Sequence, residues 1–368
     1  MTGQGWIASA RYDGAFFFGA ALLAVLAGML VLVAPVLVVP LWWVWLGLVD
    51  GPHFAATWVR TYLDPQERRT RAPLLLGSLV FLLPGFIALG VGRVLGSPAP
   101  FEAFLGFAAL WAVHHAVRQH FGIMSIYQRL GGASPRARAQ DSAFLHGTMW
   151  LLFVVYLLVF PGNRTLLGLP PEPSVQEQWA VRALAATSAA VILGYAGLLA
   201  RRWRRSEALR PGLYALLVAV GTSAFSYFLV GAFEPLVPNP TNGEQLSFAV
   251  VIVGGTLHGV QYLGIVFATN RRRYAAGGEA TLAARLGRAP VLAYGCLVAV
   301  SLLYLVVNAC RGASPGLALF PYDSDAGRFF LALYWGGALH HYYLDQKIWH
   351  PRRDPVLRRE LGLAEPSP

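Results

Sequence analysis

The sequence predicts an all-α integral membrane protein, a polytopic helical bundle of about ten transmembrane helices, from its composition and the lengths of its apolar runs. Of the 368 residues, 56% are hydrophobic and only 13% are charged, whereas soluble domains carry about 25% charged residues. So little charge cannot cover the surface of a water-soluble globule. Two cysteines cannot build a disulfide scaffold, and 13% aromatic residues exclude a disordered chain.

Ten stretches are long enough to cross a bilayer, which takes about 20 mostly apolar residues. Pro35 and Pro73 mark the starts of two spans, Pro161 marks an end, and residues 235–243 form a turn sequence. Because the first two spans meet at Pro35, we expect a helical hairpin there. The mixed apolar and basic residues 280–287 predict a short interfacial helix. The predicted spans are 14–34, 35–58, 73–95, 101–128, 143–161, 179–200, 211–234, 245–269, 290–310 and 326–349.

The distribution of basic residues predicts the orientation of the bundle. Most of the 29 lysines and arginines follow the even-numbered spans, and the loops 96–100 and 235–244 contain none. By the positive-inside rule, both termini are therefore expected in the cytoplasm, and the protein in a bacterial inner membrane. The net charge of +11 lies in short clusters between apolar runs. This pattern argues against nucleic acid as a partner and favours membrane lipids.

The chain offers no clear domain boundary and no internal repeat. We expect a single transmembrane domain over residues 1–349 and a short cytoplasmic tail over 350–368. The first residues lack a basic region and a small-residue cleavage site, so no removable signal peptide is expected.

The nine histidines all map to the cytoplasmic half or edge of the predicted bundle. Ionisable side chains inside a membrane are costly and usually face the bundle interior. Asp50 precedes His53 by three residues, and Asp345 follows His341 by four, so each carboxylate shares a helix face with an imidazole. Hydrogen bonding between helices is the alternative interpretation of these side chains. The predicted metal ligands are His53, His114, His115, His120, His258, His340, His341, Asp345 and Asp50.

Imidazoles with one or two carboxylates suit iron, zinc or copper, and the scarcity of cysteine disfavours thiolate sites. Non-haem iron is our first choice, mononuclear or dinuclear. Arg118 lies inside a span, where it is expected to bind an anionic group or to pair with a carboxylate. Arg118, Gln261 and Tyr262 are the candidate catalytic residues that position substrate or oxygen.

The histidine segments are similar, in order and form, to those of the Brp/Blh family of membrane-bound, iron-dependent beta-carotene 15,15'-dioxygenases. The resemblance implies an iron-binding helical scaffold with histidines on several helices. It rests on Pro52-His53 for the first motif of the family, His120-Phe121-Gly122 for the second, His258 for the third, and His340 with Asp345 for the last.

The chain departs from this family at several positions. The acidic residues that follow the first two motifs in the family fall here on Thr57 and Ser125, and the second histidine of the third motif falls on Tyr262. The chain also has more spans and a longer N-terminal part than we expect of the family. The resemblance therefore supports a shared scaffold more than a shared substrate.

These observations together predict a histidine-rich membrane metalloenzyme. The leading hypothesis is a non-haem iron oxidoreductase or oxygenase that uses O2 on a lipophilic substrate, such as a lipid or an isoprenoid resembling a carotenoid, with an electron donor as a further partner. One alternative is a haem-binding electron carrier with histidine pairs as axial ligands. Another is a metal or proton transporter with the same histidines as relay sites, although the polar residues gather in one leaflet.

Overall fold

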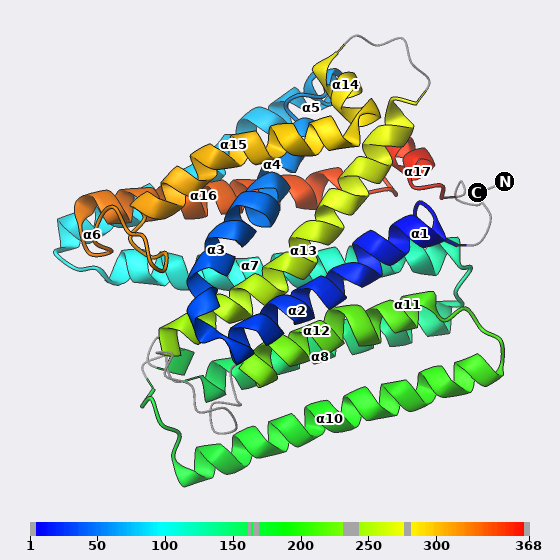
Figure 1. The fold of residues 1–368 in the computed structure, drawn as a ribbon, viewed down its shortest axis with the longest axis horizontal. Helices are drawn as coiled ribbons and strands as arrows, with labels where there is room; N and C mark the ends of the chain where they lie inside the picture. Colours follow the sequence, from blue (N-terminus) through cyan, green and yellow to red (C-terminus); the bar gives the residue numbers. More distant parts are fainter. Residues whose placement is uncertain (1–4, 161–162, 165–168, 231–242, 276–280, 364–368) are drawn as a thin grey trace. The chain divides into compact units, whose positions relative to one another are not determined.

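The computed structural model describes residues 5–160, 163–164, 169–230, 243–275 and 281–363, and this part of the chain is helical without a strand (Figure 1). The predicted all-α class is confirmed. Pro161 and residues 235–242 of the predicted turn lie outside the described residues. Eight of the described helical segments are long and apolar enough to cross a membrane: Ala10–Val33, Pro35–Arg60, Pro65–Leu95, Pro135–Val159, Val175–Arg204, Arg210–Phe228, Ser247–Arg273 and Pro290–Cys310.

The other two predicted spans are also helices, but they are more polar. They are α7 (Ala99–Leu130, 32 residues) and α16 (Asp325–Ile348, 24 residues). At about 1.5 Å per residue both exceed the thickness of a hydrocarbon core. Their polar side chains include five of the histidines, so the total of ten spans stays a prediction.

The chain forms two compact units, and the helices α7 and α13 (Gly243–Arg273) contribute to both. The first unit contains residues 1–42 and 117–261, and the second contains residues 43–116 and 262–368. The predicted tail lies in the second unit, where its residues Pro355–Glu360 form the helix α17.

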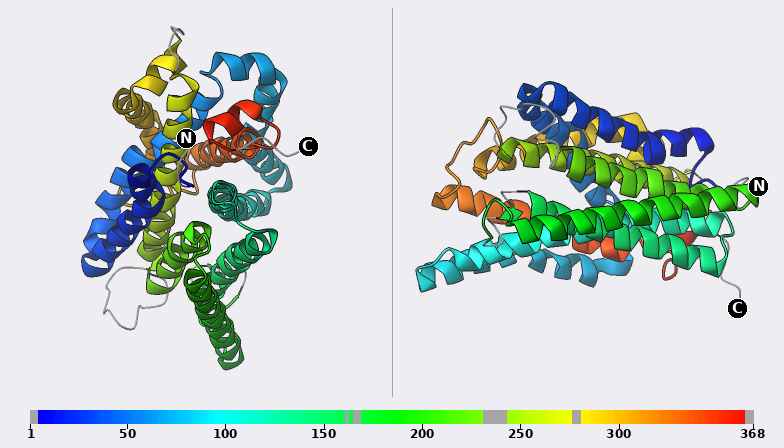
Figure 2. Two further views of the ribbon diagram at one scale, coloured as in Figure 1. Left: turned by 90° about the vertical axis from the view of Figure 1, so that its right-hand side faces the viewer. Right: turned by 90° about the horizontal axis from the view of Figure 1, so that it is seen from below.

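In the first unit, α8 (Pro135–Val159) packs along α10 (Val175–Arg204), as Figures 1 and 2 show. The buried carboxylate of Asp141 on α8 accepts hydrogen bonds from Tyr195 and Arg202 on α10, both at 2.6 Å. The ring of Phe144 stacks on Tyr195 with centroids 3.7 Å apart. The remaining elements of this unit are α1 (Ala10–Asp13), η1 (Gly14–Phe18), α2 (Gly19–Val33), η2 (Pro35–Leu37), part of α3 (Val38–Trp45), α11 (Arg210–Leu213), η5 (Tyr214–Val220), α12 (Gly221–Ala224) and η6 (Phe225–Val230).

The predicted span 35–58 is not one continuous α-helix, because a π-helical turn lies between its two α-helical segments, α3 and α4. This turn is η3 (Leu46–Asp50), and α4 (Gly51–Arg60) follows it directly. Helix α14 (Leu282–Arg288) confirms the short helix predicted near residues 280–287. The other elements of the second unit are α5 (Pro65–Ser78), η4 (Leu79–Leu82), α6 (Pro84–Leu95), α15 (Pro290–Cys310), α16 and α17.

Two glycines allow close packing around α4 and α16 in the second unit. A Cβ atom on Gly51 would lie 2.6 Å from Ser301 Oγ of α15, and one on Gly336 of α16 would lie 2.7 Å from the carbonyl oxygen of Leu82. Only residues without a side chain fit at these crossings. They bring α15 against α4, and η4 against α16.

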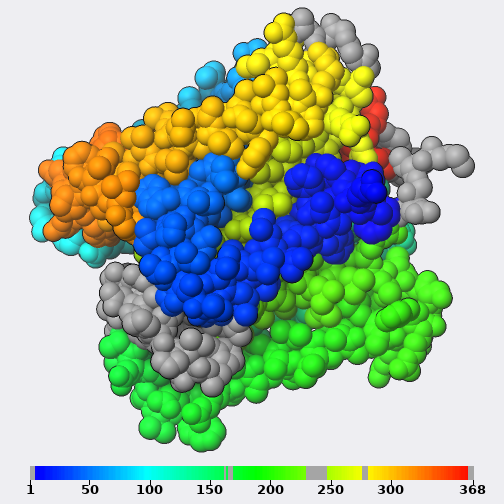
Figure 3. Space-filling view, in the orientation of Figure 1, coloured from blue at the N-terminus to red at the C-terminus, as the bar shows by residue number. Residues whose placement is uncertain are grey.

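Large apolar side chains point outward from several helices. On α15, which lies open on the face drawn in Figure 3, Val291 is 86% exposed and Leu303 is 68% exposed. Soluble monomers rarely expose large contiguous apolar patches, whereas a bilayer favours them. The eight apolar helices and this outward face indicate a membrane protein.

Candidate metal centre

Three histidines from three helices of the second unit gather in its interior. His53 of α4, His115 of α7 and His341 of α16 are at most 4% exposed. Each offers a ring nitrogen within 4.8 Å of those of the others. The ring centroid of His341 lies 4.4 Å from that of His53 and 5.3 Å from that of His115. We refer to these three residues as the histidine group.

The carboxylate of Asp345 is oriented toward this group. Its Oδ1 atom accepts hydrogen bonds from Tyr262 Oη at 2.6 Å and from Thr57 Oγ1 at 3.1 Å. Its Oδ2 atom lies 3.4 Å from His341 Nε2 and 3.8 Å from His115 Nε2. One oxygen is therefore held by neutral donors, while the other faces two imidazole nitrogens.

Thr57 also fixes the orientation of His341. Its Oγ1 atom lies 2.7 Å from Nδ1 of His341. With the proton on Nδ1, the ring donates to Thr57 and leaves the Nε2 lone pair directed at the group, as metal-ligating histidines commonly do. Packing holds the rings as well: Phe54 stacks on His341 at 4.7 Å, and Tyr342 stacks on His115 at 4.4 Å.

This donor set fits a transition-metal ion. Ligand atoms bound at about 2.1 Å from an ion lie about 3 to 3.5 Å from one another. The separations of 3.4 Å and 3.8 Å at Asp345 Oδ2 approach these values, so small side-chain movements complete the geometry. Imidazoles with a carboxylate suit iron, zinc or copper. Within the described residues, Asp345 Oδ2 accepts no hydrogen bond, which leaves it available as a ligand.

His258 lies on α13, one helical turn before Tyr262, and is 9% exposed. It belongs to the first unit, where its carbonyl oxygen accepts a hydrogen bond from Gln119 Nε2 at 2.8 Å. Residues four apart on a helix share a face, so α13 presents His258 on the same side as Tyr262.

Asp50 and His340 have other partners in the second unit. Asp50 accepts a hydrogen bond from Tyr304 Oη and lies 3.9 Å from His53 Nδ1, so it can orient His53 from outside the group. His340 Nε2 lies 2.9 Å from Tyr62 Oη. Successive residues of a helix point about 100° apart, so His340 and His341 face different neighbours. The prediction placed both among the ligands, whereas the structure brings only His341 to the histidine group.

His120 and Gln261 lie in a separate hydrogen-bonded group of the first unit. His120 Nδ1 lies 2.8 Å from Tyr214 Oη, and Tyr214 donates to Gln261 Oε1 at 3.1 Å. Gln261 Nε2 donates to the carbonyl oxygen of Phe17 at 2.9 Å. These contacts join four helical elements, α7, η5, α13 and η1, and match the interpretation of such side chains as interhelical hydrogen bonds.

His114 and Arg118 are exposed on α7. The Arg118 guanidinium lies over the ring of Phe121, 5.0 Å from its centroid. A cation–π contact at the surface satisfies this side chain without a buried carboxylate. The residue pattern alone could not distinguish His114 from the buried His115 beside it.

Thr57, Tyr304 and Phe54 are residues of the site that sequence reasoning missed as contributors. The sequence shows that Thr57 shares a helix face with His53, four residues earlier, although Thr57 was not among the predicted ligands or catalytic residues. Tyr304 is 254 residues from Asp50 and has no comparable sequence pattern.

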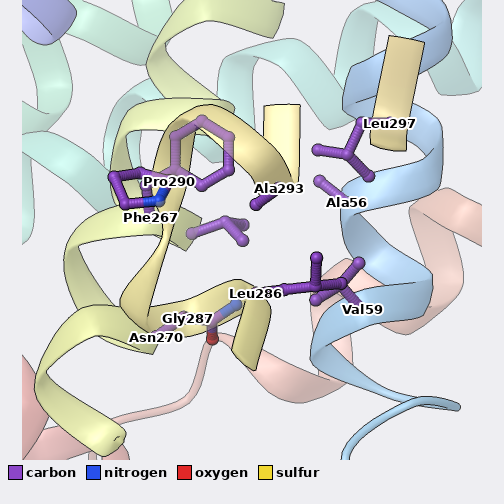
Figure 4. Close-up of a pocket in the computed structure, with 10 residues that line it drawn as sticks. Ala56, Val59, Phe267, Asn270, Leu286, Gly287, Pro290, Ala293 and Leu297 are labelled. Carbon is purple, nitrogen blue, oxygen red and sulfur yellow. The ribbon is translucent and has the colours of Figure 1, made fainter. Parts of the chain in front are cut away.

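A small apolar cavity lies between α4, α13, α14 and α15 (Figure 4). Its volume is about 10 Å³, and Ala56, Leu286 and Leu297 are among its lining residues. That volume holds about one water molecule. The cavity is a packing defect rather than a substrate chamber.

Comparisons of the chain with protein-family models, with curated proteins and with solved structures find no match.

Proposed function

We propose that this protein is an integral-membrane, non-haem iron oxidoreductase or oxygenase that uses O2 on a lipophilic substrate from the bilayer. The observation that carries the proposal is the carboxylate of Asp345, held at Oδ1 by Tyr262 and Thr57 and directed at Oδ2 toward His115 and His341. Purely structural hydrogen bonding would not require a buried carboxylate oxygen to face two imidazole nitrogens.

The proposed ligands are His53, His115, His341 and Asp345. His258, which belongs to the first unit, stays a ligand predicted from the sequence alone. A bound iron supplies redox chemistry and activation of O2. The resemblance of the histidine segments to the Brp/Blh family supports iron and an isoprenoid-like substrate.

The neighbouring residues of the chain have separate proposed roles. Thr57 and Tyr262 hold the carboxyl group of Asp345 in its orientation by donating to its Oδ1 atom. Phe54 and Tyr342 cover the imidazole rings and exclude water from them. Fixed, dry surroundings of this kind preserve ligand geometry. The site is proposed to lie in the cytoplasmic half of a bacterial inner membrane, within reach of a soluble electron donor.

The ring spacing favours this proposal over a haem-based carrier. A haem places its flat macrocycle between two axial imidazoles. Ring centroids at 4.4 Å and 5.3 Å leave no space for a macrocycle among the three histidines.

Conversion of a lipophilic probe tests the proposal. Purified protein in lipid nanodiscs is loaded with Fe(II), supplied with beta-carotene and a reductant, and assayed for O2 uptake and cleaved or oxygenated products. We expect turnover that His115→Ala abolishes and that His146→Ala retains, since His146 contacts Ser142 and Phe121 in the first unit. A wild-type protein that holds iron yet consumes no O2 with carotenoid or unsaturated-lipid probes would contradict the proposed activity.

A further inference from the structure

A second polar cluster of the second unit lies where α4 ends, α5 begins and α13 ends. Arg60, only 2% exposed, pairs with Glu360 of α17. Arg273 pairs with Asp64, Glu67 and Glu360. The cluster is completed by the pair of Arg71 with Asp354 and by Arg272, which donates to the carbonyl oxygen of Glu360.

The charges inside this cluster balance, with an arginine for each carboxylate. Burial raises the pKa of Asp64, but the Arg273 charge and the Tyr274 hydroxyl outweigh it, so the pKa lies below its ordinary value and Asp64 is ionised. Buried ion pairs are maintained when each charge has a partner. The cluster therefore neutralises itself and has no charge left to attract a ligand.

A pocket of about 790 Å³ opens beside the cluster and contains additional positive charge. Its lining includes Arg69 of α5 and Arg359 of α17, both exposed and neither a member of the cluster. Tyr274 and Thr281 also line it. Because the cluster is balanced, these two arginines give the pocket a net positive charge. Its volume lies within the range of small-molecule sites, about 300–1,000 Å³.

The pocket lies at the ends of membrane-crossing segments. The apolar segments Pro35–Arg60 and Ser247–Arg273 end beside it, and Pro65–Leu95 begins there. Segment ends of this kind lie at the level of lipid phosphates.

We propose that this pocket binds a phosphate group, carried by an anionic lipid or by a soluble phosphate compound. Guanidinium groups match phosphate oxygens with paired N–H donors, which makes arginine the preferred partner of phosphate. Arg69 and Arg359 contact the phosphate, and the ion-paired Arg273 lines the same pocket. The proposal is independent of the metal centre.

Binding to the purified full-length chain in detergent tests this assignment. The protein is titrated by thermophoresis with inorganic phosphate in one series and with dihexanoyl phosphatidic acid in another. The variant Arg69→Gln/Arg359→Gln removes the two unbalanced charges. The matched control Arg68→Gln/Arg285→Gln removes two exposed arginines that do not line the pocket.

We expect saturable binding that the pocket variant weakens by about tenfold or more per arginine and the control leaves nearly unchanged. Binding of both probes supports a site for phosphate itself, and binding of phosphatidic acid alone supports a lipid headgroup site. Absence of saturable binding for both probes overturns the proposal. Equal weakening by the pocket variant and the control does so too, because it reports only general surface charge.

Discussion

Replacing Thr57 by valine keeps the volume and branching of the side chain and removes one hydroxyl from the centre of the proposed site. That hydroxyl contacts His341 Nδ1 and Tyr262 Oη at 2.7 Å each and donates to Asp345 Oδ1 at 3.1 Å. Thr57 is fully buried, so water cannot replace these contacts. The valine variant leaves a buried ring N–H without its acceptor and one carboxylate oxygen with a single donor.

The magnitude follows from these lost contacts. An unsatisfied buried donor costs about 1–3 kcal/mol. Loss of a group that orients a metal ligand lowers metal affinity by about 10- to 100-fold, which corresponds to about 1.4–2.7 kcal/mol. The first cost lowers the stability of the fold, and the second lowers metal affinity, so Thr57→Val should weaken iron binding by about one to two orders of magnitude.

Competition with a chromophoric chelator measures the iron affinity of both proteins. Thr148→Val is the matched control, because Thr148 is also buried and its hydroxyl has no hydrogen-bond partner among the described residues. An iron affinity in Thr57→Val within about twofold of the wild type would refute the role of Thr57 in orienting ligands.

Three further substitutions test the packing and charges of the second unit. Leu297→Ala enlarges the cavity of Figure 4 and should lower the free energy of unfolding by about 2–5 kcal/mol in a denaturant titration. A loss below about 1 kcal/mol would contradict this, because it would show that neighbouring side chains move in to fill the enlarged cavity. Gly51→Ala places a methyl group 2.6 Å from Ser301 Oγ and should lower the free energy of unfolding by about 1–3 kcal/mol. If this contact is the cause, adding Ser301→Gly to the alanine variant should restore part of the lost stability. The lowered folded-state pKa of Asp64 means that its ionisation stabilises the fold above the ordinary value of 3.8 and that this contribution is lost as the pH falls through the folded-state pKa. In a plot of unfolding free energy against pH, Asp64→Asn should therefore reduce the loss of stability at acid pH. An unchanged loss would show that Asp64 is not its source.

Much of the helical architecture could be predicted because each apolar run has the length of a span. The starts of helices were harder to locate where polar residues precede the apolar run. Helix α5 begins at Pro65, capped by Asp64, which accepts hydrogen bonds from the N–H groups of Gln66 and Glu67. The prediction began that span at Pro73, because a helix start made of charged residues has no hydropathy contrast with a loop.

Helical spacing could predict which residues of the candidate site share a face of one helix, but not which helices bring their side chains together. The spacing of His341 and Asp345 predicts a shared face, and the structure brings their side chains within 3.4 Å. The rotation of a helix about its axis depends on tertiary packing, so sequence could not decide between His340 and His341. Pairs distant in sequence, such as Arg60 with Glu360, have no local pattern at all.

The most direct test of the account is the iron content of two neighbouring variants, His341→Ala and His340→Ala. His341 lies in the histidine group with its Nε2 atom facing Asp345. His340, one position earlier on the same helix, contacts Tyr62 instead. After detergent purification and anaerobic loading with Fe(II), elemental analysis should find iron in the wild type and in His340→Ala, with no Soret band, and little iron in His341→Ala. Equal iron in both variants, or its loss only from His340→Ala, would contradict the proposed metal centre.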